Sequence, residues 1–338
     1  MIMSKRKLYL AAFICAAFVA NSAPAQEDFH LSQFQSAPLY FNPGQTGMFA
    51  DIKGDYRGTA VYRSQWRALG SKPFATAYIG YDMPLRKYDK KFGVGGYIVD
   101  NNAMAGQYNT LNVMGSGAYN IMDGTDEHYL SAGLQMGILY KSFNPANYTY
   151  DIQYNSSTGD FDQTISSMET WSRTSLVRFD ANLGVYYKYL PTGKKYKPAA
   201  GLAVYHLTKP NESFTSRKSR LPMRFVFHTL CDFKLNDDFI LQPHFLYMNQ
   251  AKAYEANIGA LLFYKIKNSS MEVLGGVDYR VKDAIVAHIG FRQENHYFRF
   301  SYDINTSSLN NYTGGRGAWE FSLVLVGKFD TPMFKPMF

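Results

Sequence analysis

Hydrophobic and polar side chains alternate along two runs near the C-terminal end of the chain. Within residues 296–304, every second side chain from Phe298 to Ile304 is aromatic or aliphatic and those between are charged or polar, as in Phe300, Ser301 and Tyr302. Residues 317–328 repeat the pattern. A period of two places alternate side chains on opposite faces of a strand, so both runs predict half-buried β-strands. A soluble sandwich and a membrane barrel both contain such strands.

Runs of this kind follow one another through most of the chain. We predict about fourteen strands, over residues 51–63, 74–82, 92–100, 106–120, 128–142, 171–189, 197–207, 222–235, 238–248, 253–266, 271–281, 283–291, 296–304 and 317–328. An even number of antiparallel strands is typical of a closed outer-membrane barrel. Charged residues on the second face predict a polar lumen, because lipid disfavours charges near the middle of the bilayer.

The connections between these runs alternate in length. Odd-numbered connections include the long polar stretches 144–170, 208–221 and 305–316, and even-numbered ones include the short stretches 236–237 and 267–270. Long loops outside and tight turns on the periplasmic side are the outer-membrane pattern, and a sandwich has no reason to keep it. We therefore predict an all-β fold, a transmembrane antiparallel up-and-down β-barrel of about 14 strands spanning residues 51–328.

The start of the chain indicates export. Basic Lys5, Arg6 and Lys7 precede a short apolar run, and Ala23-Pro-Ala25 has the small residues of a cleavage site, which predicts a signal peptide over residues 1–25 that is cut before Gln26. Its removal takes away three basic residues and no acidic one, so the formal charge falls from +8 to +5. The 27 Tyr and 25 Phe residues suit aromatic girdles at two bilayer interfaces. These features predict the outer membrane of a Gram-negative bacterium.

Two segments flank the predicted barrel. Residues 26–50 do not alternate cleanly and contain Pro38 and Pro43, so we expect a folded segment of turns, either periplasmic or plug-like in the barrel mouth. We predict that residues 329–338 form a C-terminal tail.

Motifs for catalysis or metal binding are sparse. The seven histidines are scattered without metal-ligand spacing, and Cys231 is the single cysteine after the signal peptide. Gly93-Val-Gly-Gly96 has no helix pattern after it and does not predict a phosphate loop. Basic residues and aromatics do not interleave in one patch, so nucleic-acid binding has no support. We predict no catalytic residue, no cofactor and no metal, although Ser301 and His288 lie on strands that we expect to be adjacent.

Several segments together resemble the PorP/SprF family of the type IX secretion system. They are Asp28-Phe-His-Leu-Ser-Gln-Phe34, Pro38-Leu-Tyr-Phe-Asn-Pro43 with Gly47, Tyr62-Arg-Ser-Gln-Trp66, Tyr81-Asp-Met-Pro84, Gly201-Leu-Ala-Val-Tyr-His-Leu207 with Pro210, Tyr302-Asp-Ile, Tyr312-Thr-Gly-Gly and Glu320-Phe-Ser-Leu. Trp319 departs from the family, which more often has a histidine there. The resemblance implies an outer-membrane barrel of the type IX secretion or gliding machinery.

The resemblance also implies the partners: outer-membrane lipid, type IX secretion subunits, a periplasmic peptidoglycan-binding protein, or the C-terminal domain of a secreted surface protein. An exposed recognition surface at one mouth would serve such partners. The candidate partner-binding residues are Pro38, Asn42, Pro43, Tyr148, Tyr150, Tyr154, Arg217, Lys218, Arg220, Tyr312 and Arg316.

Each candidate set also has a simpler interpretation. The prolines and Asn42 could form a turn that braces the barrel, the tyrosines could belong to an interfacial belt, and the basic run Arg217–Arg220 could be solvated charge. Our hypothesis is a non-enzymatic barrel that supports export or surface anchoring of a partner protein. The alternatives are a passive channel or hydrophobic-solute transporter, and an outer-membrane lipid-modifying enzyme.

Overall fold

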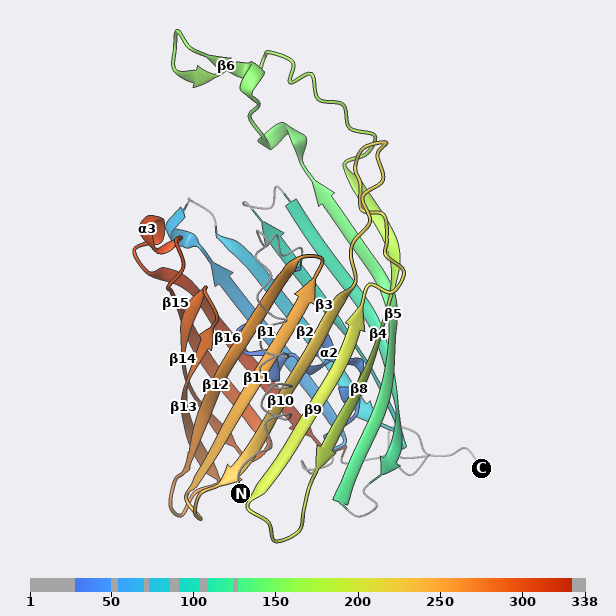
Figure 1. Cartoon of the computed structure of the whole chain (residues 1–338), viewed down its shortest axis with the longest axis vertical. Helices are drawn as coiled ribbons and strands as arrows, with labels where there is room; N and C mark the ends of the chain where they lie inside the picture. Colours follow the sequence, from blue (N-terminus) through green and yellow to red (C-terminus); the bar gives the residue numbers. More distant parts are fainter. Residues whose placement is uncertain are drawn as a thin grey trace, which may run out of the picture.

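A closed barrel of fourteen antiparallel strands dominates the computed structural model, which describes residues 28–49, 54–69, 73–85, 91–103, 108–123 and 127–329 (Figure 1). Each barrel strand pairs with its neighbours along the chain, and β1 pairs with β16 to close the ring. The strands are β1 (Tyr56–Gln65), β2 (Phe74–Pro84), β3 (Phe92–Ala103), β4 (Tyr108–Asp123), β5 (His128–Phe143), β8 (Ser175–Tyr189), β9 (Tyr196–Tyr205), β10 (Arg224–Lys234), β11 (Phe239–Gln250), β12 (Ala253–Lys265), β13 (Met271–Arg280), β14 (Ala284–Gln293), β15 (His296–Asn305) and β16 (Arg316–Gly327). The predicted fold class is confirmed.

The strand ends differ from the prediction by a few residues. β8 begins at Ser175 rather than at residue 171, because the chain before it bends away from the wall. There the backbone N–H groups of Ser172 and Arg173 both donate to the carbonyl of Phe214 in another loop. The predicted start of the first strand at residue 51 lies outside the described residues, as do the signal peptide and residues 330–338 of the tail.

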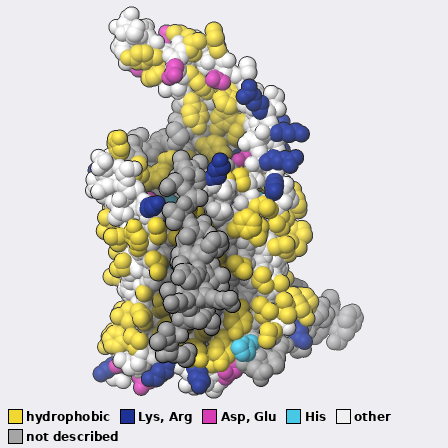
Figure 2. Space-filling model, in the orientation of Figure 1, with side chains coloured by type: hydrophobic (Ala, Val, Ile, Leu, Met, Phe, Trp, Pro, Cys, Tyr) yellow, Lys and Arg dark blue, Asp and Glu magenta, His cyan; other side chains and the backbone are white. Residues whose placement is uncertain are grey.

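The two faces of the strands divide as the alternation predicts. On β15, Phe300, Tyr302 and Ile304 point outward and are exposed, whereas Ser301 and Asp303 are buried in the lumen. Figure 2 shows hydrophobic side chains over the outer wall, with Lys and Arg gathered at the rim of one end and on the loops of the other. An apolar outer band between two polar ends is what a lipid bilayer requires of a barrel.

The two ends of the barrel also differ. Loops 144–174, 206–223 and 306–315 lie at one end, and short turns join the strands at the other (Figure 1). Loop 144–174 has structure of its own, with the short helices η7 (Pro145–Asn147) and η8 (Asp151–Gln153) and a small hairpin of β6 (Tyr154–Asn155) and β7 (Asp160–Phe161). Loop 306–315 contains α3 (Asn310–Thr313). We call these ends the long-loop end and the short-turn end.

Residues 28–49, which we call the plug segment, lie inside the barrel (Figure 1). They form η1 (Phe34–Ser36), α2 (Pro38–Phe41) and η2 (Pro43–Gln45). Aromatic side chains of this segment pack with lumen-facing residues such as Tyr78 and Tyr97 into one buried cluster. No helix in the described part of the chain is long and apolar enough to cross a membrane.

Candidate functional site

Proline and asparagine residues shape the plug segment locally. Pro38 and Pro43 occupy the first turns of α2 and η2, where a missing N–H costs nothing and the fixed φ suits a helical start. Asn42 lies between them, and its side-chain oxygen accepts a hydrogen bond from the backbone N–H of Gly44 at 2.8 Å. The segment is thereby folded into tight turns that fit within the lumen.

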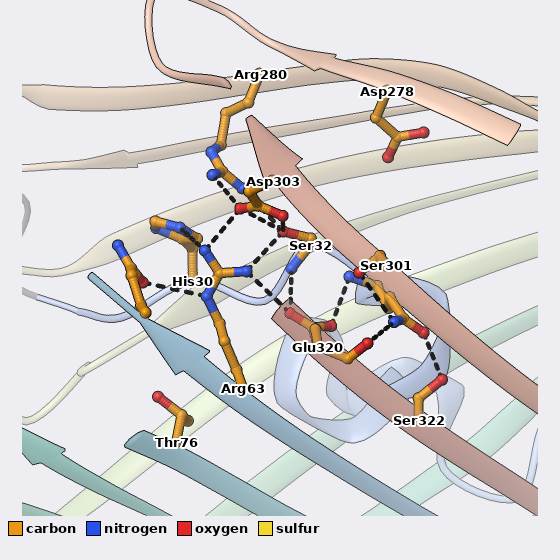
Figure 3. Close-up of polar contacts among 12 residues, drawn as sticks. His30, Ser32, Arg63, Thr76, Asp278, Arg280, Ser301, Asp303, Glu320 and Ser322 are labelled. Atoms are coloured by element: carbon orange, nitrogen blue, oxygen red, sulfur yellow. Dashed lines mark hydrogen bonds and ion pairs between the residues drawn. The ribbon is translucent and has the colours of Figure 1, made fainter. Parts of the chain in front are cut away.

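A cluster of buried charges holds the first residues of the plug segment, around Ser32, to the barrel wall (Figure 3). Arg63 of β1 donates to Asp303 of β15 at 2.8 Å and to Glu320 of β16 at 3.2 Å. Arg280 of β13 donates to Asp303 at 2.6 Å, and both arginines donate to the hydroxyl of Ser32 in the plug segment. These four charged side chains are at most 2% exposed. Charges so deeply buried are tolerated only because each has a partner of opposite sign.

Backbone N–H groups of the plug segment complete this cluster. Ser32 and Gln33 donate from the backbone to the two carboxylate oxygens of Glu320, at 2.9 and 2.8 Å. The amide side chain of Gln33 donates to Ser301 and accepts from Ser322. Charge-assisted hydrogen bonds of this kind are stronger than neutral ones, so Glu320 fixes the position of the segment on β16.

His30 is uncharged within the same cluster. Burial and the neighbouring Arg280 and Arg63 guanidinium groups hold the pKa of His30 well below its ordinary value. Its Nε2 lies 3.0 Å from Arg63, which can only donate, so this nitrogen accepts the hydrogen bond. Its Nδ1 faces the carboxylate of Glu255 at 3.3 Å. The imidazole therefore bridges a cation and an anion without carrying a charge.

A second set of charges fixes the first described residue of the plug segment. Asp28 lies 2.8 Å from Nε2 of His206 and 3.2 Å from Arg224, while Nδ1 of His206 lies 2.6 Å from Asp180. Burial disfavours the imidazolium of His206, but the two carboxylates outweigh it and raise the pKa of His206 to about 9. Burial likewise opposes ionisation of Asp28, yet His206 and Arg224 hold the pKa of Asp28 below its ordinary value. Both groups are charged at neutral pH and form an ion pair.

The turn at Asn42 and Pro43 touches the wall at glycines. A Cβ atom on Gly133 would lie 2.2 Å from the carbonyl oxygen of Pro43, and one on Gly184 would lie 2.2 Å from the side-chain oxygen of Asn42. The amide of Asn42 also donates to the carbonyl of Val185 at 2.9 Å. Any larger side chain at these two wall positions would displace the turn.

The last part of the plug segment is held near the start of β1. Arg57 forms a two-pronged ion pair with Asp82, at 2.9 and 2.7 Å, and donates to the carbonyl of Gln45 at 3.0 Å. Asp82 in turn accepts from the backbone N–H of Gly47 at 2.6 Å. The plug segment is thus joined to the wall by side chains of strands all around the ring.

The predicted partner-binding residues lie in three separate places. Pro38, Asn42 and Pro43 are buried inside the barrel, in positions that suit the bracing interpretation. Tyr312 is exposed within α3 of loop 306–315, and Arg316 is exposed at the start of β16. Contact of any of these residues with a partner stays a prediction.

The remaining predicted residues are brought together at the other side of the long-loop end. Tyr148, Tyr150 and Tyr154 belong to loop 144–174, and the exposed side chains of Arg217, Lys218 and Arg220 belong to loop 206–223. Phe214 joins the two loops, because its ring lies 4.6 Å from that of Phe143, at the base of loop 144–174. A buried ion pair between Lys141 and Glu212 joins the same two regions.

The described residues contain no catalytic arrangement around Ser301. Ser301 and His288 are partners in the register of β14 and β15, as their predicted adjacency requires. No hydrogen bond joins their side chains among the described residues, and the hydroxyl of Ser301 instead accepts from Gln33. No group of three or more His, Cys, Asp or Glu side chains in the described ranges could hold a metal ion.

Sequence reasoning assigned no role to the charges that bind the plug segment. Arg63, Asp303 and Glu320 appeared only as polar positions in alternating strands or within the segments that carry the family resemblance. The available signal was the presence of charges on lumen-facing positions. Their pairing could not be found without the ring closure that brings β1 beside β16, with β15 as the next strand in the ring.

Comparison with solved structures finds other outer-membrane barrels. The toluene transporter TbuX of Ralstonia pickettii has a TM-score of 0.49 and 9% identity, covering 86% of this chain and 92% of its own. A FadL homologue of Pseudomonas aeruginosa has a TM-score of 0.43 and 12% identity, with coverage of 84% and 91%. BamA of Haemophilus ducreyi has a TM-score of 0.41 and 11% identity, with coverage of 81% and 70%. At these identities the similarity concerns the fold alone.

No curated protein matches the sequence significantly. The family model described as type IX secretion system membrane protein PorP/SprF matches residues 23–325, and with the barrel and its plug segment in view we conclude that this chain belongs to the PorP/SprF family.

Proposed function

We propose that this outer-membrane barrel anchors a partner protein of the type IX system at its long-loop end, and that it neither conducts solute nor catalyses a reaction. The observation that carries the proposal is loop 144–174, which stands above the barrel (Figure 1). This loop exposes large apolar side chains. They are Ile152, Tyr154, Phe161, Ile165, Met168 and Trp171. Apolar side chains grouped on a loop beyond the lipid-facing wall are typical of a protein interaction surface.

The neighbouring loop adds charge to this surface. Arg217, Lys218 and Arg220 are exposed and form no ion pair with a carboxylate of the described residues. Since Phe214 packs loop 206–223 against the base of loop 144–174, the apolar and basic groups lie on one side of the barrel mouth. A partner that presents apolar side chains flanked by carboxylates would match both the apolar side chains of loop 144–174 and the basic side chains of loop 206–223. The C-terminal domain of a secreted surface protein is the partner that the family suggests.

The plug segment supports anchoring over the two alternatives. A passive channel requires an open polar lumen, whereas residues 28–49 lie in this lumen and are hydrogen-bonded to buried charged side chains of the wall. A lipid-modifying enzyme requires a nucleophile and a base within reach at one leaflet. Ser301, the serine that sequence reasoning considered, lies on the lumen side and is bonded to the plug segment.

The test is an affinity pull-down of the tagged barrel from native outer membrane, followed by mass spectrometry. We expect secretion-machine subunits or one large surface protein to be recovered, and to be lost when residues 144–170 are deleted. The double variant Ile165→Ser with Met168→Ser keeps the loop length and should also lose the partner. Ser166→Ala with Ser167→Ala in the same loop should retain it. A barrel recovered without partners that conducts solute in planar bilayers would favour the channel instead.

A further inference from the structure

A cavity of about 800 Å³ lies at the short-turn end, on the opposite side of the plug segment from the long loops. Gln35, Ser36 and Pro38 of the plug segment form its inner end. Its outer rim comprises the β8–β9 turn, residues 190–195, and Glu294 and Asn295 of the β14–β15 turn. These two turns are six strands apart in the ring of fourteen, so the cavity spans the mouth of the barrel. We call it the basic vestibule.

Positive charge predominates in the basic vestibule. The basic side chains that line it are Arg57, Lys188, Lys194, Lys195, Lys197, Lys234, Arg292 and Arg299, and the acidic ones are Asp232 and Glu294. Three of the basic side chains are already paired with carboxylates: Arg57 with Asp82, Lys234 with Asp237 and Arg292 with Glu272. Lys194, Lys195 and Lys197 are exposed and form no ion pair with a carboxylate of the described residues. Like charges that line a concave site surrounded by protein of low dielectric focus a positive potential, which attracts anions.

Arg299 adds a buried charge at the inner end of the vestibule. Its side chain is 5% exposed, and its guanidinium donates to the amide oxygen of Gln35 at 3.1 Å and to the hydroxyl of Ser36 at 2.8 Å. Both acceptors are neutral, and no carboxylate of the described residues lies within ion-pair distance. Arg63 and Arg280, which are equally buried in the same lumen, both have carboxylate partners. Asp278 and Glu320 act on Arg299 electrostatically but form no direct ion pair with it. A buried arginine without a directly paired carboxylate is costly, so the geometry favours an anion from outside the chain.

The opposite wall of the vestibule is apolar. It is lined by Ile240, Leu261, Phe263, Leu274 and Val324, which come from β11, β12, β13 and β16. Four of the lysines come from β8, β9 and the turn between them, and Lys234 comes from the end of β10. A volume of about 800 Å³ is near the upper end of ordinary ligand pockets, roughly 300–1,000 Å³. A free inorganic anion would fill little of this space and would have no use for the apolar wall.

From this arrangement we infer that the basic vestibule binds an acidic polypeptide segment that also carries apolar side chains. Carboxylates of the segment face the lysines of the β8–β9 side and reach Arg299, while its apolar side chains pack on the β11–β13 wall. The binding site is independent of the loops to which the anchoring role is assigned, because the plug segment separates the two ends of the barrel. The barrel therefore has two docking surfaces, one at each mouth.

The test uses the purified full barrel in nanodiscs of neutral phosphatidylcholine, where both mouths are accessible. The probe is a fluorescein-labelled peptide of repeating Glu-Glu-Phe, and binding is followed by fluorescence anisotropy. A peptide of repeating Lys-Lys-Phe controls for apolar binding alone. We expect the acidic peptide to bind, and its Kd to rise about tenfold in the triple variant Lys194→Gln, Lys195→Gln, Lys197→Gln.

A second triple variant controls for net charge. Lys209→Gln, Lys252→Gln and Lys282→Gln remove an equal number of positive charges, but from exposed turns of the long-loop end. This variant should leave the Kd of the acidic peptide unchanged. Equal weakening by both triple variants, or displacement of the peptide by inorganic phosphate more strongly than by chloride at the same ionic strength, would overturn the inference. Since the assay contains no partner protein, its outcome does not depend on the anchoring role, which the pull-down tests.

Discussion

Arg63 illustrates how single residues determine this structure. It is 1% exposed, yet it donates to two carboxylates, to Ser32 and to His30. An arginine can satisfy so many acceptors because its planar guanidinium presents five N–H donors in a fixed arrangement. The residue therefore joins β1 to β15, β16 and the plug segment at one point.

Replacing Arg63 by Met should destabilise the barrel strongly. The substitution leaves Asp303 with Arg280 alone and leaves Glu320 without a cation, and uncompensated buried charges cost roughly 3–5 kcal/mol. We expect the free energy of unfolding to fall by about this amount in urea titrations of the barrel in lipid vesicles. Arg220→Met, an exposed change at the long-loop end, should alter it by less than about 0.5 kcal/mol. If both substitutions lowered the free energy of unfolding equally, the buried cluster would contribute no more to stability than an exposed residue does.

The plug segment is the element on which the interior depends. It is too short to form a core of its own, and its helices of three or four residues would not persist in water. The barrel wall supplies what it lacks, through aromatic packing in the middle, an ion pair at Asp28, and hydrogen bonds with charged wall residues at both ends. Asp28 and His206 form one of these attachments, and it depends on pH.

The attachment at His206 should weaken in alkaline solution. The pKa of His206 is raised from its ordinary 6.5 to about 9 by Asp28 and Asp180, so its stabilisation is complete below pH 6.5 and is lost as the pH rises through 9. The whole change corresponds to about 3 kcal/mol. Unfolding free energies measured from pH 6 to pH 10 should show this decline, and His206→Gln should remove it. An identical decline in the variant would assign the effect to other groups.

At the scale of the whole molecule, the barrel is closed in two senses. The β1–β16 pairing closes the ring, so each barrel strand pairs with a neighbour on both sides, as a β-structure in lipid requires. The plug segment occupies the lumen and separates the long-loop end from the short-turn end. A protein built in this way suits recognition at its two mouths better than passage between them.

A substitution that displaces the plug segment should open the lumen. In Gly133→Leu the new side chain would collide with the backbone of Pro43, whereas Gly115→Leu adds a side chain on the lipid-facing side of β4, where the nearest atom lies 3.7 Å from the Cβ position. In planar bilayers we expect no steady conductance from the native barrel or from Gly115→Leu, and measurable conductance from Gly133→Leu. Steady conductance by the native protein would contradict a closed lumen.

Much of the wall could be predicted from local patterns. Phe300, Ser301 and Tyr302 alternate because successive side chains of a strand face lipid and lumen in turn, and lipid favours apolar side chains whereas the lumen favours polar ones. The same alternation recurs along the other strands of the wall. The hairpin of β6 and β7 escaped prediction, because two-residue strands produce no period. The attachment of Asp28 to His206 was not predicted either, since the two residues are 178 positions apart and nothing in the sequence between them indicates that they meet.

The sequence by itself determined the class of fold, the strand order and the resemblance to the PorP/SprF family. These follow from short-range periodicity and from local motifs, which involve only residues close together in the sequence. Only the tertiary structure decided that residues 28–49 fill the lumen, that Arg63, Asp303 and Glu320 hold them, and that a basic vestibule lies beneath. The physical reason is ring closure: it brings the first and last strands together and turns scattered polar positions into one interior, where every buried charge requires a partner.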